Sequence, residues 1–168
     1  MIITHNNKEE LLQKFAEIRK KEKGRIVHCS GVFDLTHAGH VLFFEDCKKL
    51  GDTLVVGVGS DINLKKRKPG RPIINQTMRL KMVDSLKPID YSFVGGYASP
   101  ENPLKFLGNI FEALQPDIYV INDDAFNIDE RKIFTEKHGV VLKVLSRWCP
   151  PEFEEVSTTK LIEKIQKL

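Results

Sequence analysis

The chain has 168 residues, a length that suits a single domain with a hydrophobic core large enough to fold alone. Hydrophobic residues make up 41% of it and charged residues 29%, and the net charge is +3, with basic residues spread along the chain. This balance is typical of a soluble protein and argues against a broad surface for nucleic acid. No apolar run approaches the roughly 18 residues of a membrane span. The N-terminus also lacks the apolar core of a signal peptide.

Three cysteines, Cys29, Cys47 and Cys149, are widely spaced, and no C-x-x-C pair suggests a metal site. Their odd number also argues against a disulfide framework. We therefore expect reduced thiols, buried as small hydrophobic side chains, in a cytoplasmic protein.

In the first half of the chain, an amphipathic helix precedes alternating strands and helices. Its apolar residues recur at helical spacing, whereas the strands are short apolar runs of the kind buried in parallel sheets. The predicted elements are, in order, a helix over 8–23, the strand RIVHC (25–29), a helix over 38–50 capped by Thr36, the strand TLVVGV (53–58), a polar basic loop, and a helix near 77–86.

The second half of the chain continues this alternation. Pro103 stands where a helix has its first turn, Gly139 where a helix ends, and Ser157 where a hydroxyl caps a helix. The predicted elements are the strand YSFV (91–94), a helix over 103–114, the strand DIYVI (117–121), a helix over 129–138, the strand VVLKVL (140–145), and a last helix beginning TTKLIEKI.

This order predicts an α/β fold, a Rossmann-like doubly wound sheet of five parallel strands with helices on both faces. Ligands of such sheets bind beyond the carboxyl ends of the strands, where the strand order reverses. No linker or repeat divides the chain. We therefore expect one domain over 1–168, in which an N-terminal helix (1–24) precedes an α/β core (25–168).

The stretch SGVFDLTHAGH, residues 30–40, directly follows the first predicted strand. Gly31 permits a tight turn there, and His37 and His40 fall on the first turn of the next helix. Free backbone N–H groups and the helix dipole favour an anion at such a place, and two imidazoles add donors for phosphate oxygens. Gly39, between them, leaves room for the phosphate. The alternative is one capping histidine and one histidine packed on the sheet.

A second candidate phosphate site stands at the start of the last predicted helix. Ser157, Thr158 and Thr159 combine three hydroxyls with a helix N-terminus. A plain N-cap would explain one hydroxyl but not three in a row.

GVFDLTHAGH resembles the G-x-F-D-x-x-H-x-G-H signature of the cytidylyltransferase-like nucleotidyltransferases. Three further stretches resemble motifs of that family in the same order: KKLGDTLVVGVGSD (48–61), RPIINQTMRLKMVDSLKPID (71–90) and VSTTKLIEKI (156–165). The resemblance covers nearly the whole chain. It implies an enzyme that transfers a nucleotide from a nucleoside triphosphate, ATP or CTP, to a phosphorylated sugar or polyol with release of pyrophosphate, so that 25–168 is a catalytic core.

Two branches of the family are the most similar. KPGRPIINQTMR resembles the adenylyltransferase half of ADP-heptose synthase, an enzyme of lipopolysaccharide-core biosynthesis, whereas INDDAF is closer to glycerol-3-phosphate cytidylyltransferase. Archaeal FAD synthetases are taken as a more distant option. The RPIINQ match favours ATP and an acceptor like heptose 1-phosphate. Residues 95–109 and 146–156 depart from the family on the expected acceptor side.

The resemblance also implies roles for individual residues. Catalytic contacts are expected from His37 and His40, at least one as a cation in the transition state, and from Lys65 and Lys68. Acceptor contacts are expected from Asp34, which could instead orient its loop, and from Arg147. Mg²⁺ would accompany the triphosphate, and a homodimer is possible. The nucleotide-binding residues are expected to be Gly31, Val32, Phe33, Gly39, Arg79, Asp123, Ser157, Thr158 and Thr159.

Several of these residues have plainer interpretations. The two lysines could lie in a solvated basic loop, Arg79 could form a surface salt bridge, and Asp123 and Asp124 could cap the next helix. For the whole chain, the alternatives are a non-catalytic nucleotide-binding regulatory module on the same fold and a fragment of a class I aminoacyl-tRNA synthetase. The second lacks room for an anticodon-binding domain and has no KMSKS-like loop.

Overall fold

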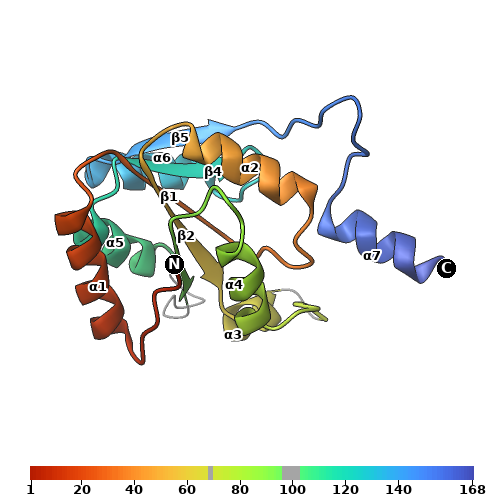
Figure 1. The fold of residues 1–168 in the computed structure, drawn as a ribbon, viewed down its shortest axis with the longest axis horizontal. Helices are drawn as coiled ribbons and strands as arrows, with labels where there is room; N and C mark the ends of the chain where they lie inside the picture. Colours follow the sequence, from red (N-terminus) through yellow and green to blue (C-terminus); the bar gives the residue numbers. More distant parts are fainter. Residues whose placement is uncertain (68–69, 96–102) are drawn as a thin grey trace.

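A computed structural model of the chain describes residues 1–67, 70–95 and 103–168. Figure 1 shows one layer of strands with helices on both sides. The elements are α1 (Lys8–Lys21), β1 (Ile26–Gly31), α2 (Ala38–Lys48), β2 (Thr53–Gly59), α3 (Asp61–Arg67), α4 (Gln76–Asp84), β3 (Tyr91–Gly95), α5 (Pro103–Leu114), β4 (Ile118–Asn122), α6 (Ile128–Lys137), β5 (Val141–Leu145) and α7 (Thr158–Gln166).

The five strands form one parallel sheet in the order β3-β2-β1-β4-β5. The chain winds outward from β1 to β3, then crosses back to place β4 on the other side of β1. The order therefore reverses between β1 and β4, which confirms the predicted doubly wound α/β fold and locates the place where such sheets bind ligands.

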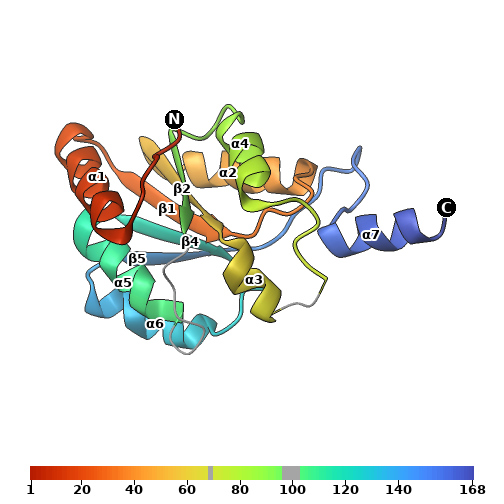
Figure 2. The same cartoon turned by 90° about the horizontal axis from the view of Figure 1, so that it is seen from below.

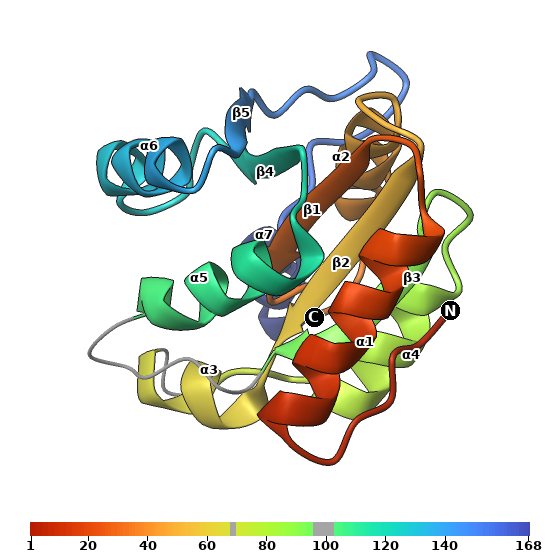
Figure 3. The ribbon, with the colours of Figure 1, turned by 90° about the vertical axis from the view of Figure 1, so that its left-hand side faces the viewer.

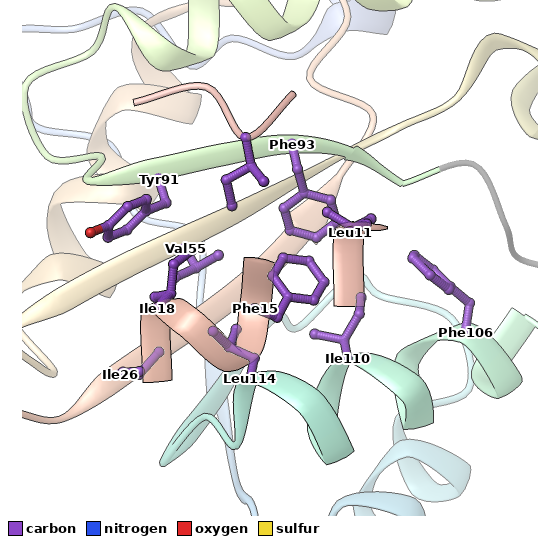
Figure 4. Close-up of a cluster of buried hydrophobic side chains, with 11 residues drawn as sticks. Leu11, Phe15, Ile18, Ile26, Val55, Tyr91, Phe93, Phe106, Ile110 and Leu114 are labelled. Atoms are coloured by element: carbon purple, nitrogen blue, oxygen red, sulfur yellow. The ribbon is translucent and has the colours of Figure 1, made fainter. Parts of the chain in front are cut away.

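Apolar side chains on both faces of the central strands hold the helices to the sheet. On one face, α1 and α5 pack on β1, β2 and β3 through the cluster drawn in Figure 4, which includes Phe15, Phe93 and Leu114. On the other face, α2 and α4 pack through Phe44 and Val83. Figure 3 shows α1 and α5 on the same side of the sheet, with α6 beyond α5.

Two local predictions differ from the structure. The segment after β2, predicted as a loop, forms the short helix α3, whose seven residues are too few to show a periodic pattern. The N-cap residue of α2 is His37 rather than Thr36, since the Thr36 hydroxyl donates to the Phe33 carbonyl oxygen (3.2 Å). Asn75 caps α4, with its side chain accepting from the Met78 N–H at 3.0 Å.

The last helix, α7, lies apart from the sheet in both Figure 1 and Figure 2. None of its residues is buried. Its first turn is nevertheless tied to the body of the protein, because the Thr158 hydroxyl donates to the Asp34 carbonyl oxygen at 2.9 Å. Across the described residues, no helix has the length and apolar character needed to cross a membrane.

The cysteine prediction is confirmed for two of the three residues. Cys29 and Cys47 are buried free thiols in the core between β1 and α2, but Cys149 is exposed. The exposed cysteine follows Trp148 in the segment that leads to α7, where there is no core to bury it.

Candidate active site

The loop between β1 and α2 brings the predicted site residues to the switch point of the sheet. Phe33 and Leu35 both have positive φ angles, +53° and +46°, which non-glycine residues seldom adopt. Between them, the Asp34 carboxylate is 4% exposed and accepts from the N–H groups of Ile73 (2.9 Å) and Ile74 (3.0 Å). Asp34 therefore orients this loop and the 71–74 segment, and its predicted contact with an acceptor stays a prediction.

His37 and His40 form a stacked pair at the start of α2. Their ring centroids are 3.9 Å apart and their planes differ by 21°. The edge of the Phe33 ring holds His40 from one side, at 5.4 Å between centroids. Both Nδ1 atoms are buried without a hydrogen-bond partner among the described residues. The alternative of one capping histidine holds for position only, because His37 is the N-cap residue of α2 but makes no side-chain cap bond.

Burial favours the neutral form of both imidazoles. It lowers the pKa of His40 to about 3, helped by the nearby His37 and the positive charge of Arg147, while Asp34 acts in the opposite direction. Burial, and then Arg147, also lower the pKa of His37. The pair therefore offers neutral N–H donors, and the predicted cation would need a bound phosphate to raise a pKa.

Gly39 permits the close packing of the histidine pair. A Cβ atom on this residue would lie 3.1 Å from His37 Cε1 and 3.6 Å from the Val156 carbonyl oxygen. A glycine is therefore needed here to avoid crowding His37, a requirement that the sequence did not reveal. Space for a phosphate at this point stays a prediction.

Arg79 is enclosed by the protein and bonds to acceptors of the chain itself. Its side chain is fully buried, which excludes a surface salt bridge. The guanidinium donates to the carbonyl oxygens of Val32, Gly59 (2.7 Å) and Ile74 (2.9 Å), and to the carboxylate of Asp61 (2.7 Å). We correct its predicted nucleotide contact to a positioning role, in which it ties the loops after β1 and β2 to the segment before α4.

Three adjoining cavities open at the carboxyl ends of the strands. The central cavity, about 320 Å³, lies over the switch point and includes Gly31, His40 and Thr159. A second cavity, about 540 Å³, lies between α2 and the 146–158 segment and shares His40, Arg147 and Thr158 with the central one. The third, about 430 Å³, lies beside α5 and shares Gly31, Tyr119 and Arg131 with the central one.

Of the remaining predicted residues, Ser157 and Arg147 line cavities and Asp123 does not. Ser157 caps α7 by accepting from the Lys160 N–H (3.2 Å), and its side chain lines the second cavity. Arg147 lines two cavities and pairs with Asp124 at 2.6 Å. By contrast, Asp123 is exposed and lines none of the three, and it is not a cap, since α6 begins after Asn127.

Of the two predicted catalytic lysines, the structure describes Lys65 alone. Lys65 is exposed on α3 and lines none of the three cavities, whereas its neighbour Leu64 lines the central one. Lys68 lies outside the described residues.

Nothing in the sequence pattern pointed to Tyr119 and Arg131, which line two of the cavities. The Arg131 guanidinium donates to the Tyr119 hydroxyl (2.5 Å) and to the Phe126 carbonyl oxygen (3.1 Å). An arginine in the second turn of a charged helix looks like an ordinary surface residue. A signal was available in its position, because α6 follows β4, a strand at the switch point.

Comparison with known proteins agrees with this geometry. Residues 28–164 match the family described as Cytidylyltransferase-like. This chain belongs to that family. The predicted resemblance is confirmed, and the chain is an enzyme of the nucleotidyltransferase type.

Relatives of two kinds are equally similar to the chain. The FAD synthase of Archaeoglobus profundus is 36% identical over 141 residues, covering 83% of this chain and 84% of that protein. The bifunctional protein HldE of Helicobacter pylori is also 36% identical, over 158 residues that make up 93% of this chain but 31% of HldE. The ranking of FAD synthetases as more distant is therefore wrong.

Solved structures support the same fold. A lipopolysaccharide core biosynthesis protein from Thermoplasma volcanium is 29% identical and superimposes with a TM-score of 0.60, covering 76% of this chain and 98% of that one. Pantoate-beta-alanine ligase from Francisella tularensis has a TM-score of 0.61 at 13% identity and shows the shared fold alone.

Proposed function

We propose that the protein transfers AMP from ATP to a phosphate monoester and releases pyrophosphate. The observation that carries this proposal is the stacked pair His37–His40, with buried unpartnered nitrogens, beside the cavity at the switch point of the sheet. Buried nitrogen atoms without partners are costly in a folded protein, and a ligand that accepts hydrogen bonds would remove that cost.

The three cavities suggest where the parts of the substrates lie. In this proposal the nucleoside occupies the cavity between α2 and residues 146–158, and the phosphates lie in the central cavity. The N-terminus of α7 would face the phosphates. Around the phosphates we place the backbone of Gly31, Val32, Phe33 and Gly39, the hydroxyls of Ser157, Thr158 and Thr159, and the side chains of His37, His40 and Arg147.

In the proposed reaction, a phosphate oxygen of the acceptor attacks the α-phosphorus of ATP. A new P–O bond forms, the bond from that phosphorus to the bridging oxygen of the β-phosphate breaks, and the electron pair leaves with pyrophosphate. The protein supplies positioning and neutralises charge. His37 and His40 would donate hydrogen bonds to the phosphate oxygens as negative charge moves toward the leaving group.

Mg²⁺ is part of the proposal as a companion of the triphosphate. Among the described residues there is no group of three His, Cys, Asp or Glu side chains that could hold a metal ion. In this proposal Mg²⁺ is held mainly by phosphate oxygens and water, which is how the ion binds in many phosphoryl-transfer enzymes. When bound, the ion would neutralise charge on the phosphate oxygens.

Two acceptors follow from the relatives. A heptose 1-phosphate fits the RPIINQ motif and the similarity to HldE, and would place the enzyme in lipopolysaccharide biosynthesis. Flavin mononucleotide (FMN) fits the similarity to the FAD synthases, since adding AMP to FMN yields FAD. The CTP-dependent alternative, with glycerol 3-phosphate as acceptor, rests on the INDDAF stretch after β4. A homodimer is a separate proposal, which light scattering would test.

The direct test is pyrophosphate release with Mg²⁺, crossing ATP, CTP, GTP and UTP with heptose 1-phosphate, FMN and glycerol 3-phosphate, with products identified by mass spectrometry. ATP with either of the first two acceptors should give a nucleotidylated product. Turnover with CTP and glycerol 3-phosphate alone would replace the proposal with the cytidylyltransferase alternative. ATP binding without product from any acceptor would favour a regulatory module.

A further inference from the structure

The cavity beside α5 has walls of an unusual kind for a sugar-binding site. Aromatic and aliphatic side chains from β3 and α5 dominate it, including Phe93, Phe106, Leu107 and Ile110. Figure 4 shows Phe93 on its strand and Phe106 and Ile110 on the helix that covers the sheet. Within the described ranges its polar side chains are few: Ser30, Ser60, Asn63, Tyr119 and Arg131.

Glycines at the strand ends leave backbone as part of the cavity wall. Gly59 on β2 pairs with Gly95 on β3 in the parallel register, and both line the cavity. A Cβ on Gly57 would lie 2.9 Å from Phe93 Cζ, so the Phe93 ring lies directly over that glycine. An apolar surface beside backbone that carries no side chains suits a flat aromatic ring better than a sugar ring with its many hydroxyl groups.

Among the residues that the structure describes, Arg131 is the one charged side chain that lines this cavity, and it also lines the central cavity. Within the described part of the chain, no carboxylate forms an ion pair with it. Its hydrogen bonds to Tyr119 and Phe126 use two of the five guanidinium N–H donors. The Phe126 ring lies 4.8 Å from the guanidinium carbon and helps to hold the group in place.

We propose that the acceptor binds here, as a phosphate monoester with a flat aromatic body in the α5 cavity and its phosphate on the Arg131 guanidinium. This inference rests on the proposed function, because it assigns the acceptor of that reaction. A heptose would bury many hydroxyls against side chains that cannot bond them, which is costly. An aromatic ring gains from the same walls, and the unpaired cation at the cavity junction gains a dianion.

Arg131 is held so that its free donors can serve a phosphate at the boundary of the two cavities. The Tyr119 hydroxyl accepts from Arg131 and lies 3.4 Å from the Ser30 hydroxyl at the end of β1. The acceptor's phosphate would thereby lie toward the central cavity, where the proposed reaction needs its attacking oxygen.

The test compares FMN with riboflavin, which has the same ring but no phosphate. Flavin fluorescence titrations should show that the wild-type protein binds FMN roughly 10- to 100-fold more tightly, the range expected for hydrogen bonds to a charged group. In Arg131→Gln the preference should fall to within about threefold, and Arg131→Lys should keep part of it. Lys132→Gln, at the exposed neighbouring position on α6, should leave the preference unchanged.

A cavity-filling variant tests the location of the ring independently of the phosphate. A Cβ on Gly59 would have its nearest contact at 3.6 Å, so a larger side chain has room to begin there. Gly59→Leu should weaken FMN and riboflavin equally, by at least tenfold, while ATP binding measured by calorimetry stays within about threefold of wild type. Unchanged flavin binding in this variant would overturn the assignment of the cavity.

The outcomes separate this inference from the proposed function. Pyrophosphate release with ATP and heptose 1-phosphate, without flavin binding, would overturn the inference and leave the proposed function standing. Equal wild-type affinity for FMN and riboflavin would overturn the role of Arg131. Flavin binding with the expected Arg131 dependence, but without turnover with any nucleoside triphosphate, would support the ligand class and overturn the proposed function.

Discussion

Arg79 and the pair His37–His40 both contact the loop that follows β1, but they differ in whether their polar atoms have hydrogen-bond partners. The Arg79 guanidinium is fully buried and finds four acceptors, three carbonyl oxygens and one carboxylate. The two histidines each keep a buried Nδ1 without a partner in the described structure. The arginine therefore holds the loops of the site, whereas in the proposed function the histidines donate to a phosphate that binds later.

His28 shows that an unpartnered nitrogen alone does not mark a ligand site. Its Nε2 is also buried without a described partner, yet the ring is stacked near Phe93 and Tyr119 in the core and lines none of the three cavities. Position next to a cavity is the second condition. The comparison thus predicts which substitutions damage the fold and which damage activity.

The largest effect is expected from Arg79→Leu. The substitution leaves three carbonyl oxygens and the Asp61 carboxylate without their donor, so the free energy of unfolding should fall by about 3–5 kcal/mol. Urea denaturation followed by circular dichroism measures this. Arg131→Gln, which loses a half-buried cation with two bonds, should cost no more than about 1 kcal/mol. Similar losses in both variants would end the distinction between the two arginines.

His40→Ala should give the opposite pattern to Arg79→Leu. Loss of one preorganised donor to the reacting phosphates should lower kcat roughly 10²- to 10³-fold, while the free energy of unfolding changes by less than about 1 kcal/mol. Steady-state pyrophosphate release and urea denaturation measure the two quantities. The matched control is His138→Ala, whose ring lies outside the three cavities. Near-normal turnover in His40→Ala would show that the pair is structural.

Acid should destabilise the protein through its buried histidines. Burial lowers the pKa of His28 from 6.5 to about 4, so between these pH values the unfolded chain binds a proton that the folded chain does not. The free energy of unfolding therefore decreases as pH falls through this window, by on the order of 3 kcal/mol from His28 alone.

Urea denaturation at pH 7, 6 and 5 would measure this dependence in the wild-type protein and in His28→Leu. The variant should show a shallower slope, with the remainder due to His37 and His40, whose pKa values are also lowered. An equally steep slope in the variant would show that His28 does not retain its depressed pKa in solution.

The sheet and the histidine loop could be predicted because each carries its signal in a few consecutive residues. Near-continuous apolar runs marked the strands, and two histidines after a strand and before a helix marked the candidate anion site. The α3 helix was not predicted because Leu64 is the only buried residue among those of its side chains that the structure describes, and one residue shows no period. The surroundings of Arg79 and Arg131 could not be predicted for another reason. Whether an arginine is enclosed or faces a cavity depends on segments distant in the sequence, such as the Gly59 carbonyl and the Tyr119 hydroxyl.

The smallest effect, and the finest test of the comparison, is expected from Gly39→Ala. The added methyl group would lie 3.1 Å from His37 Cε1, so the ring must move by a few tenths of an ångström. We expect kcat to fall by about fivefold, because such shifts matter in a positioned site. Alanine also has the better helix propensity, by up to about 1 kcal/mol, which should offset part of the crowding. Thermal unfolding and initial rates would measure both effects.

Gly108→Ala in α5 is the matched control for Gly39→Ala. Its added methyl group would be nearly as crowded, 3.2 Å from Phe134 Cζ, but it would touch no histidine of the stacked pair. Its effect on stability should resemble that of Gly39→Ala, while kcat should be unchanged. A loss of kcat confined to Gly39→Ala would show that the position of the His37 ring, rather than helix packing in general, sets the rate. Equal losses in the two variants would remove that role from Gly39.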